Sequence, residues 1–291
     1  MKNILITGGS GFVGKNLKEA FQSKYNIFAP SHNELELLDY DALENYISSN
    51  QINVIIHSAI HVPIFNGLEN EFFNDMKMFL NIEKISSKVE RVLYFGSGAE
   101  FDKRYNITLV NELDIGKHLP VSQYGLSKYT MNKIATQSNN IYNLRLFGIF
   151  GKYELWNIKF ISNLCCKAMY DIPLTIRKDC NFDFLYIEDL PAIVEWFIEN
   201  NPDFHDYNIC SGKPLALTEI AELVNKVSQK NLSITILTEG KDLDYTADNL
   251  RLKIQIPSLK LTPMETAINE LYKYYCSKKN DINYNIIKES K

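Results

Sequence analysis

The sequence has no apolar stretch that approaches the ~18 residues needed to cross a membrane. It contains only five cysteines, none at the spacing of a zinc site, so no metal ligands are expected, and the adjacent Cys165 and Cys166 are expected to pack in an apolar helix. The formal net charge of -4 provides no strong attraction to nucleic acid or to an anionic membrane. Lys2 leads into a strand-like run rather than a signal peptide, so we expect a reduced, cytoplasmic protein without nucleic-acid or membrane partners.

The order of apolar segments indicates the fold class. The first half alternates short, continuously apolar strands with amphipathic helices, which is typical of a parallel sheet covered on both faces. Its strands are predicted at residues 3–6, 26–29, 53–57, 91–95 and 142–147. We therefore predict an α/β protein with a doubly wound (Rossmann) parallel sheet in residues 1–165. A smaller C-terminal α/β substrate-binding lobe is predicted in residues 166–291, with an approximate boundary and interleaved segments.

A glycine-rich turn separates the first strand from the first helix. The segment reads Thr7-Gly8-Gly9-Ser10-Gly11-Phe12-Val13-Gly14. The first glycines allow a tight turn, Gly11 lets the backbone approach a pyrophosphate, and Gly14 lets the helix pack close to the sheet. The amino end of the helix, with Phe12 and Val13, then presents free N–H groups to the phosphates. This context predicts a dinucleotide-binding site.

The end of the second strand bears on the choice of dinucleotide. An NAD site usually carries an acidic residue there, ~20 residues after the glycines. This sequence has no acid before Glu34, whereas Ser31 and His32 can donate hydrogen bonds to a 2′-phosphate. NADP(H) is therefore favoured, and NAD(H) stays an alternative. Asp39 can meet the adenine edge or can cap the next helix.

Tyr124 and Lys128 place a phenol and an ammonium one helical turn apart on the same face of a helix. A nearby cation stabilises a phenolate and makes the tyrosine a usable acid or base near neutral pH. Four other tyrosine–lysine pairs have this spacing, but only Tyr124 opens a helix at a suitable distance after the fourth strand. Ser97 follows that strand at the carboxyl edge, where ligands bind in such sheets, and its hydroxyl can hold a substrate oxygen.

Together these segments resemble the extended short-chain dehydrogenase/reductase family, in its NAD(P)-dependent epimerase/dehydratase branch. The resemblance implies that Ser97, Tyr124 and Lys128 form the catalytic set, with Lys128 also holding the nicotinamide ribose. It also implies that Ser58 and Ala59 run beside the cofactor, and that two copies form a homodimer through a bundle containing the Tyr124 helix. Besides the glycine turn and the catalytic set, the likeness rests on residues 54–59, 144–151, 183–190 and 207–212.

Departures from the family pattern narrow the expected reaction. Dehydratases of this branch carry an Asp-Glu pair where Gly98 and Ala99 stand here. Members that epimerise and then reduce carry a cysteine at the place of Ala99 and a histidine near the place of Lys159. Neither dehydration nor carbon-acid epimerisation is therefore supported. Glu100 is unusual beside the site, where it can contact substrate or point into solvent.

Two residues that often bind the substrate nucleotide in the family are also replaced. The family often has Asn where Gly148 stands and Arg where Phe182 stands, so we consider Arg177 and Arg251 as substitutes. The resulting hypothesis is an NADP(H)-dependent reductase of a 4-keto (deoxy)sugar nucleotide. A nucleotide-sugar 4-epimerase with tightly bound NAD needs no further residues and stays open. A cofactor-binding module without turnover is a third possibility that the intact catalytic set disfavours.

Overall fold

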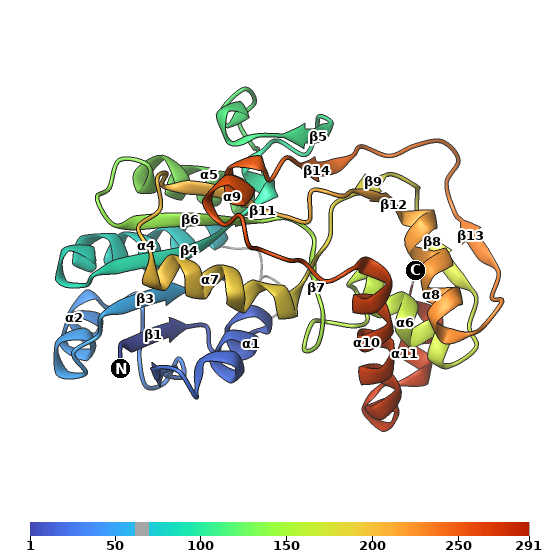
Figure 1. Ribbon diagram of the computed structural model, residues 1–291, viewed down its shortest axis with the longest axis horizontal. Coiled ribbons are helices and arrows are strands. Elements are labelled where there is room, and N and C mark those ends of the chain that lie inside the picture. Colours follow the sequence, from blue (N-terminus) through green and yellow to red (C-terminus); the bar gives the residue numbers. More distant parts are fainter. Residues whose placement is uncertain (62–69, 291) are drawn as a thin grey trace.

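A six-stranded parallel sheet organises the larger part of the molecule (Figure 1). The computed structural model describes residues 1–61 and 70–290. Strand order in the sheet is β11-β6-β4-β3-β1-β2, which confirms the predicted doubly wound parallel sheet. Its strands are β1 (Asn3–Thr7), β2 (Asn26–Phe28), β3 (Val54–His57), β4 (Arg91–Ser97), β6 (Ile141–Leu146) and β11 (Asp206–Ile209).

Alternation along the central strands creates two cores, one on each face of the sheet. In β1, Ile4 and Ile6 join one buried cluster, whereas Leu5 between them joins the other. This alternation follows from the two-residue period of a strand, and it explains why these strands read as continuous apolar runs. The first cluster is covered by α1 (Phe12–Phe21) and α7 (Leu190–Glu199), and the second by α2 (Tyr40–Ser49), α4 (Glu71–Ile85) and α5 (Gln123–Ala135).

The smaller lobe is mainly helical and lies on the right of Figure 1. Helix α10 packs against α6 and α8, and the lobe also contains a two-stranded parallel sheet of β8 and β13. Cys165 and Cys166 are buried on α6, where burial raises the pKa of both thiols. The elements of the lobe are α6 (Phe160–Met169), β8 (Leu174–Ile176), α8 (Leu217–Ser228), β13 (Ile234–Ile236), α10 (Met264–Ser277) and α11 (Tyr284–Glu289).

Short strands connect the two parts. A mixed four-stranded sheet has the order β12-β9-β14-β5, and a parallel pair joins β7 to β10. Because β5 comes from the first half of the chain and β11 of the large sheet comes from the second, the two parts are interleaved in sequence. The short strands are β5 (Ile107–Val110), β7 (Ile149–Phe150), β9 (Asn181–Phe182), β10 (Leu185–Tyr186), β12 (Leu215–Ala216) and β14 (Tyr245–Ala247). Helix α9 (Leu250–Gln255) follows β14.

Within the described ranges, no helix combines the length and the apolar character that a membrane crossing requires.

Candidate active site

Ser97, Tyr124 and Lys128 lie on the wall of one cavity. Ser97 is the last residue of β4, and α5 begins directly before Tyr124, with the Ser122 hydroxyl capping the helix by accepting the Gly125 N–H at 3.0 Å. The cavity has a volume of about 540 Å³ and is called the catalytic cavity below. The structure thus brings the three sequence-predicted catalytic residues together at the carboxyl edge of the sheet, where ligands of such folds bind.

Lys128 is almost completely buried beneath this cavity. Its Nζ donates a hydrogen bond to the carbonyl oxygen of Phe95 at 2.9 Å and lies 5.7 Å from the centre of the Tyr124 ring. Burial lowers the pKa of Lys128, while the charge of Asp75 opposes that shift. Asp75 on α4 is itself 1% exposed. A buried carboxylate here was missed in the sequence, because nothing local distinguishes it from other helical acids.

Tyr124 carries a proton at neutral pH. Burial raises the pKa of its phenol to about 12, although hydrogen bonding by Ser97 lowers it in part. A protonated phenol beside a serine hydroxyl and an ammonium is suited to donate a proton to a substrate oxygen.

The glycine turn forms a second cavity of about 620 Å³, called the glycine-turn cavity, lined by Gly8, Gly11, Ser31, His32, Ser58 and Ala59 among others. Gly8 has φ of +68°, and a Cβ there would lie 2.8 Å from the backbone nitrogen of Ala59. A Cβ on Gly14 would lie 2.3 Å from the carbonyl oxygen of Gly8, so only glycine lets α1 approach the turn this closely. Val13 lines the catalytic cavity instead, and Phe12 packs on the hydrophobic core.

The amino end of α1 fits a dinucleotide diphosphate. The N-cap residue Gly11 has no side chain to satisfy the first N–H groups, and the first turn has no acidic residue. These free donors, together with the helix dipole, attract an anion. Ser58 and Ile60 line both this cavity and the catalytic cavity, so a dinucleotide bound at the glycine turn can extend to Tyr124.

Two carboxylates, Glu34 and Glu36, lie in the loop after β2, and Glu36 lines the glycine-turn cavity. Ser31 donates from its N–H at 2.7 Å and from its hydroxyl at 2.8 Å to the same carboxylate oxygen of Glu34. His32 Nε2 lies 3.2 Å from a carboxylate oxygen of Glu36, which also lines the cavity. The donors expected to face a 2′-phosphate therefore have acidic partners within their own loop.

Asp39 requires a correction. Of the two roles that the sequence left open, the structure shows the helix cap: the Asp39 carboxylate accepts the N–H of Ala42 at 3.1 Å at the start of α2. Asp39 is not among the residues that line the glycine-turn cavity, whereas the preceding Leu37 and Leu38 are. An N-cap carboxylate is held by the helix it begins, which accounts for this orientation.

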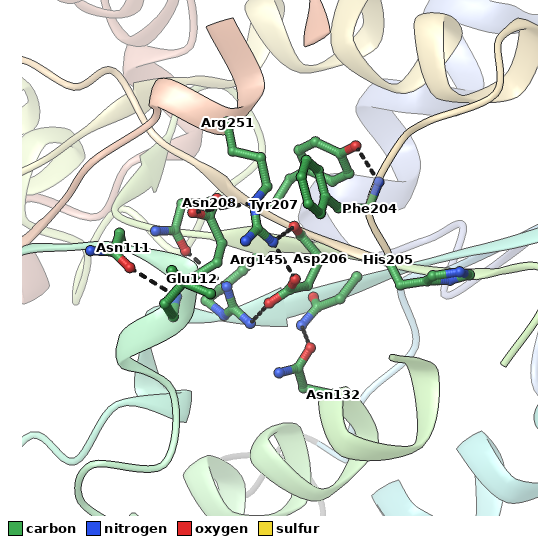
Figure 2. A network of polar contacts seen from close by, with 12 residues as sticks. Asn111, Glu112, Asn132, Arg145, Phe204, His205, Asp206, Tyr207, Asn208 and Arg251 are labelled. Atoms are coloured by element: carbon green, nitrogen blue, oxygen red, sulfur yellow. Dashed lines mark hydrogen bonds and ion pairs between the residues drawn. The ribbon is translucent and has the colours of Figure 1, made fainter. Parts of the chain in front are cut away.

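Glu100 and Arg251 also require correction, because both belong to a buried polar network centred on Arg145 and Asp206. Figure 2 shows Arg145, Asp206 and Arg251 of this network. The Glu100 carboxylate is completely buried and pairs with Arg145 Nε at 2.7 Å, so it contacts neither a cavity nor solvent. Arg145 also donates to Asp206 at 2.9 Å, and Arg251 binds the other oxygen of Asp206 at 2.6 Å. Neither Glu100 nor Arg251 is among the described residues that line the glycine-turn cavity, the catalytic cavity or the outer cavity described below.

This network holds Ser97 in place. Glu100 accepts the N–H of Ser97 at 3.1 Å, and Ser97 Oγ accepts the N–H of Ala99 at 3.1 Å, so the two residues close a capping box around the turn at Gly98–Glu100. Arg145 sits on β6 directly beside the end of β4. The Arg145–Glu100 pair therefore ties the catalytic turn to the neighbouring strand.

A third cavity, of about 400 Å³, opens beside the catalytic cavity and is called the outer cavity. Arg177 lines it, as the sequence analysis considered; its guanidinium is 82% exposed and lies 3.1 Å from Asp242. Cationic Lys178 and Lys103 also line the outer cavity. The two cavities share Lys103, Ile158, Phe160, Phe182, Leu217 and Tyr245.

The sequence analysis missed three polar residues of the catalytic cavity: Lys103 and Tyr245 stand at its junction with the outer cavity, and Glu154 lies on its wall. Lys159, which the sequence analysis named near the place of a family histidine, also lies on the wall. Burial, and secondarily the charge of Lys159, lowers the pKa of Lys103. Burial raises the pKa of Glu154 to about 7, although the Ser162 hydroxyl donates to its carboxylate. These residues lie on segments that are distant in the sequence, so only the folded structure shows that they line one cavity.

The fold and this site define a nicotinamide-dinucleotide-dependent enzyme of the short-chain dehydrogenase type. Comparison of the sequence with protein families places residues 4–210 in the NAD dependent epimerase/dehydratase family. The chain belongs to this family, whose members act on nucleotide sugars, and the resemblance stated from the sequence is confirmed.

Known relatives include nucleotide-sugar enzymes. The chain is 24% identical to GDP-L-colitose synthase of Yersinia pseudotuberculosis, over 77% of this chain and 81% of the relative. Its fold matches GDP-L-fucose synthetase from Naegleria fowleri bound to NADP, with a TM-score of 0.80, 16% identity and coverage of 96% and 95%. It also matches GDP-mannoheptose C4 reductase from Campylobacter jejuni with NADP bound, with a TM-score of 0.81, 14% identity and coverage of 94% and 98%.

Proposed function

We propose that the protein reduces the keto group of a 4-keto (deoxy)sugar nucleotide, with NADP(H) as the hydride source. The observation that carries the proposal is that Tyr124 and Ser97 line one cavity that shares lining residues with both the glycine-turn cavity and the outer cavity. The reduced nicotinamide supplies the hydride when it is bound. Tyr124 then transfers its proton to the carbonyl oxygen as negative charge develops there.

The other two catalytic residues prepare this proton transfer. Ser97 donates a hydrogen bond to the same carbonyl oxygen and stabilises its developing charge. Lys128 lies below the Tyr124 ring, and its positive charge favours the phenolate that remains after the transfer. Because Lys128 is 2% exposed, water screens this effect little.

Residue types around the cavity favour reduction over other reactions of the family. Gly98 and Ala99 offer no acid or base for elimination of water. Among the described residues, the lining of the catalytic cavity includes Lys159 but no cysteine, so these residues do not supply the cysteine–histidine pair of the family members that epimerise. Simple hydride transfer needs only the catalytic set that is present.

The outer cavity is the proposed place of the substrate nucleotide. Lys103, Arg177 and Lys178 line it and supply positive charge for a diphosphate. Lys103 stands at the junction, which suits contact with the phosphate nearest the sugar. In this proposal the sugar occupies the catalytic cavity between Tyr124 and the ring of Phe182.

The preference for NADP(H) rests on the exposed His32, whose side chain is 79% exposed at the end of the glycine-turn cavity. A 2′-phosphate can replace Glu36 as its partner. The prediction is a lower Kd for NADPH than for NADH, with the difference reduced by His32→Ala, measured by fluorescence titration. Equal affinities in the unmodified protein would contradict this preference.

A nucleotide-sugar 4-epimerase with retained NAD is the second candidate. Glu34 and Glu36 in the loop after β2 favour it, because a carboxylate there suits the 2′-hydroxyl of NAD and repels a 2′-phosphate. The purified protein distinguishes the two functions. Tightly held NAD supports the epimerase, whereas exchangeable NADP supports the reductase.

Turnover of a 4-keto-6-deoxy sugar nucleotide, followed by NADPH absorbance, tests the main proposal. Tyr124→Phe should lower kcat by roughly 100-fold or more, since it removes the proton donor. Tyr129→Phe is a matched control, because Tyr129 lies on the same helix with Lys133 one turn later at 5.3 Å from its ring centre. Near-normal turnover by Tyr124→Phe would refute the assignment.

The protein is also proposed to act as a cytoplasmic homodimer. Helices α4 and α5 pack side by side, and both expose large apolar side chains, including Phe73, Leu80 and Leu126. Association of two copies through these helices would bury that surface.

A further inference from the structure

Tyr245 comes from a different part of the chain than the catalytic set, yet it reaches the same cavity. It opens β14, where it pairs with Ile107 of β5 and Phe182 of β9. Its ring centre lies 5.1 Å from that of Phe147 and 4.7 Å from that of Phe182, and Lys103 Nζ lies 4.8 Å from it. Strand pairing and ring packing therefore fix the direction of the phenol.

The hydroxyl of Tyr245 lies against the turn that follows Ser97. A Cβ built on Gly98 would be 2.3 Å from the Tyr245 hydroxyl oxygen and 2.7 Å from its Cζ. Any side chain at position 98 would therefore displace the phenol. The place where dehydratases of the family carry an acid is filled here by a hydroxyl from another strand.

The number of hydrogen bonds that Ser97 can form indicates a role for the Tyr245 hydroxyl. A serine oxygen has one proton to donate and two lone pairs. One lone pair accepts the N–H of Ala99 at 3.1 Å. Tyr124 and Tyr245 both line the catalytic cavity with Ser97, and the Tyr245 hydroxyl lies against the residue that follows Ser97. One of the two phenols can therefore donate a hydrogen bond to the second lone pair of Ser97 Oγ. The hydroxyl proton of Ser97 is then left for the side of the other phenol.

We propose that Tyr245 is a positioning residue whose O–H donates to Ser97 Oγ, so that the serine proton is directed toward Tyr124 and the substrate carbonyl oxygen. This inference rests on the proposed reduction, in which Ser97 must donate to that oxygen. With both lone pairs occupied, Ser97 Oγ cannot accept a hydrogen bond from Tyr124, and the O–H of Tyr124 is left to donate to the substrate. Such a chain of hydrogen bonds also strengthens the donor at its end.

A double-mutant cycle on turnover tests this coupling. Tyr245→Phe should lower kcat by roughly 10-fold with little change in KM, because it removes one hydrogen bond from an oxyanion donor. In the Ser97→Ala background, the same change should alter kcat by less than about twofold. Equal factors in the two backgrounds would show that Tyr245 only packs, and would overturn the proposal.

Tyr94→Phe is the matched control. It removes a buried hydroxyl that has no hydrogen-bond partner in the described part of the chain, so kcat should stay near that of the unmodified protein.

A measurement without turnover separates this inference from the proposed function. With 3-fluorotyrosine introduced at position 124 only, ¹⁹F NMR follows ionisation of that phenol in the protein bound to oxidised dinucleotide. Tyr245→Phe should raise the pKa of residue 124, because the serine proton is no longer directed to it. Lack of turnover by the unmodified protein would refute only the proposed reductase function. An unchanged pKa of residue 124 in the Tyr245→Phe variant would refute the proposed role of Tyr245.

Discussion

Replacing Glu154 with glutamine should stabilise the protein at pH 8 and change its stability much less at pH 5. Glu154 is 6% exposed on the wall of the catalytic cavity, and burial raises the pKa of its carboxyl from 4.5 to about 7. The folded state therefore binds this proton more tightly than the unfolded state. The favourable contribution of the protonated Glu154 carboxyl to stability is complete below pH 4.5 and is lost as the pH rises through about 7.

The magnitude follows from the shift. The rise in the pKa of Glu154 from 4.5 to about 7 corresponds to about 3 kcal/mol of lost stability when the carboxyl is fully ionised. At pH 5 the loss is roughly 1 kcal/mol, since the unfolded carboxyl is then only partly ionised. Glutamine keeps an oxygen that accepts from Ser162 and carries no charge at any pH, so it removes this penalty.

Urea unfolding of the protein without ligands, at pH 5 and pH 8, measures the effect. The stability gain of Glu154→Gln should be about 2 kcal/mol larger at pH 8 than at pH 5. Glu265→Gln serves as the control: its side chain is 49% exposed on a surface ion pair, so it should stay within about 0.5 kcal/mol at both values. An equal gain at both pH values, or a loss at pH 8, would refute the reasoning.

Three further outcomes are expected. Arg145→Met should lower the free energy of unfolding by about 3–5 kcal/mol in urea titrations, because Glu100 is left buried without its cation; a loss under about 1 kcal/mol would contradict this. Gly8→Ala should weaken dinucleotide binding by roughly tenfold or more in calorimetric titrations, since φ of +68° and contact with Ala59 exclude a Cβ; unchanged affinity would place the diphosphate elsewhere. Phe73→Glu should convert the proposed dimer to a monomer in analytical ultracentrifugation, whereas an unchanged mass would assign the contact to another surface.

Part of this site could be predicted because its signals are local. The strand–glycine–helix order around Gly8 and Gly14 lies within one short segment, and the spacing of Tyr124 and Lys128 is one turn of one helix. Backbone geometry alone brings such residues together. The parallel sheet could be predicted for the same reason, since each strand is a continuous apolar run with its own helix.

The roles of other residues depended on which strands became neighbours. Glu100 was expected either to contact substrate or to point into solvent, and Arg251 was considered as a substitute for a missing family arginine. Instead, Arg145 on the adjoining strand pairs with Glu100, and Asp206 on the next strand pairs with Arg251, so both residues belong to the interior. Tyr245 reaches Ser97 only through pairing of β14 with β5 and β9.

The sequence by itself therefore determined the fold class, the glycine turn and the spacing of the catalytic pair. Only the tertiary structure decided which charges are neutralised in the interior and which hydroxyls meet at Ser97. The physical reason is that a buried charge or hydroxyl acts through partners a few ångströms away, and most of those partners lie far along the chain.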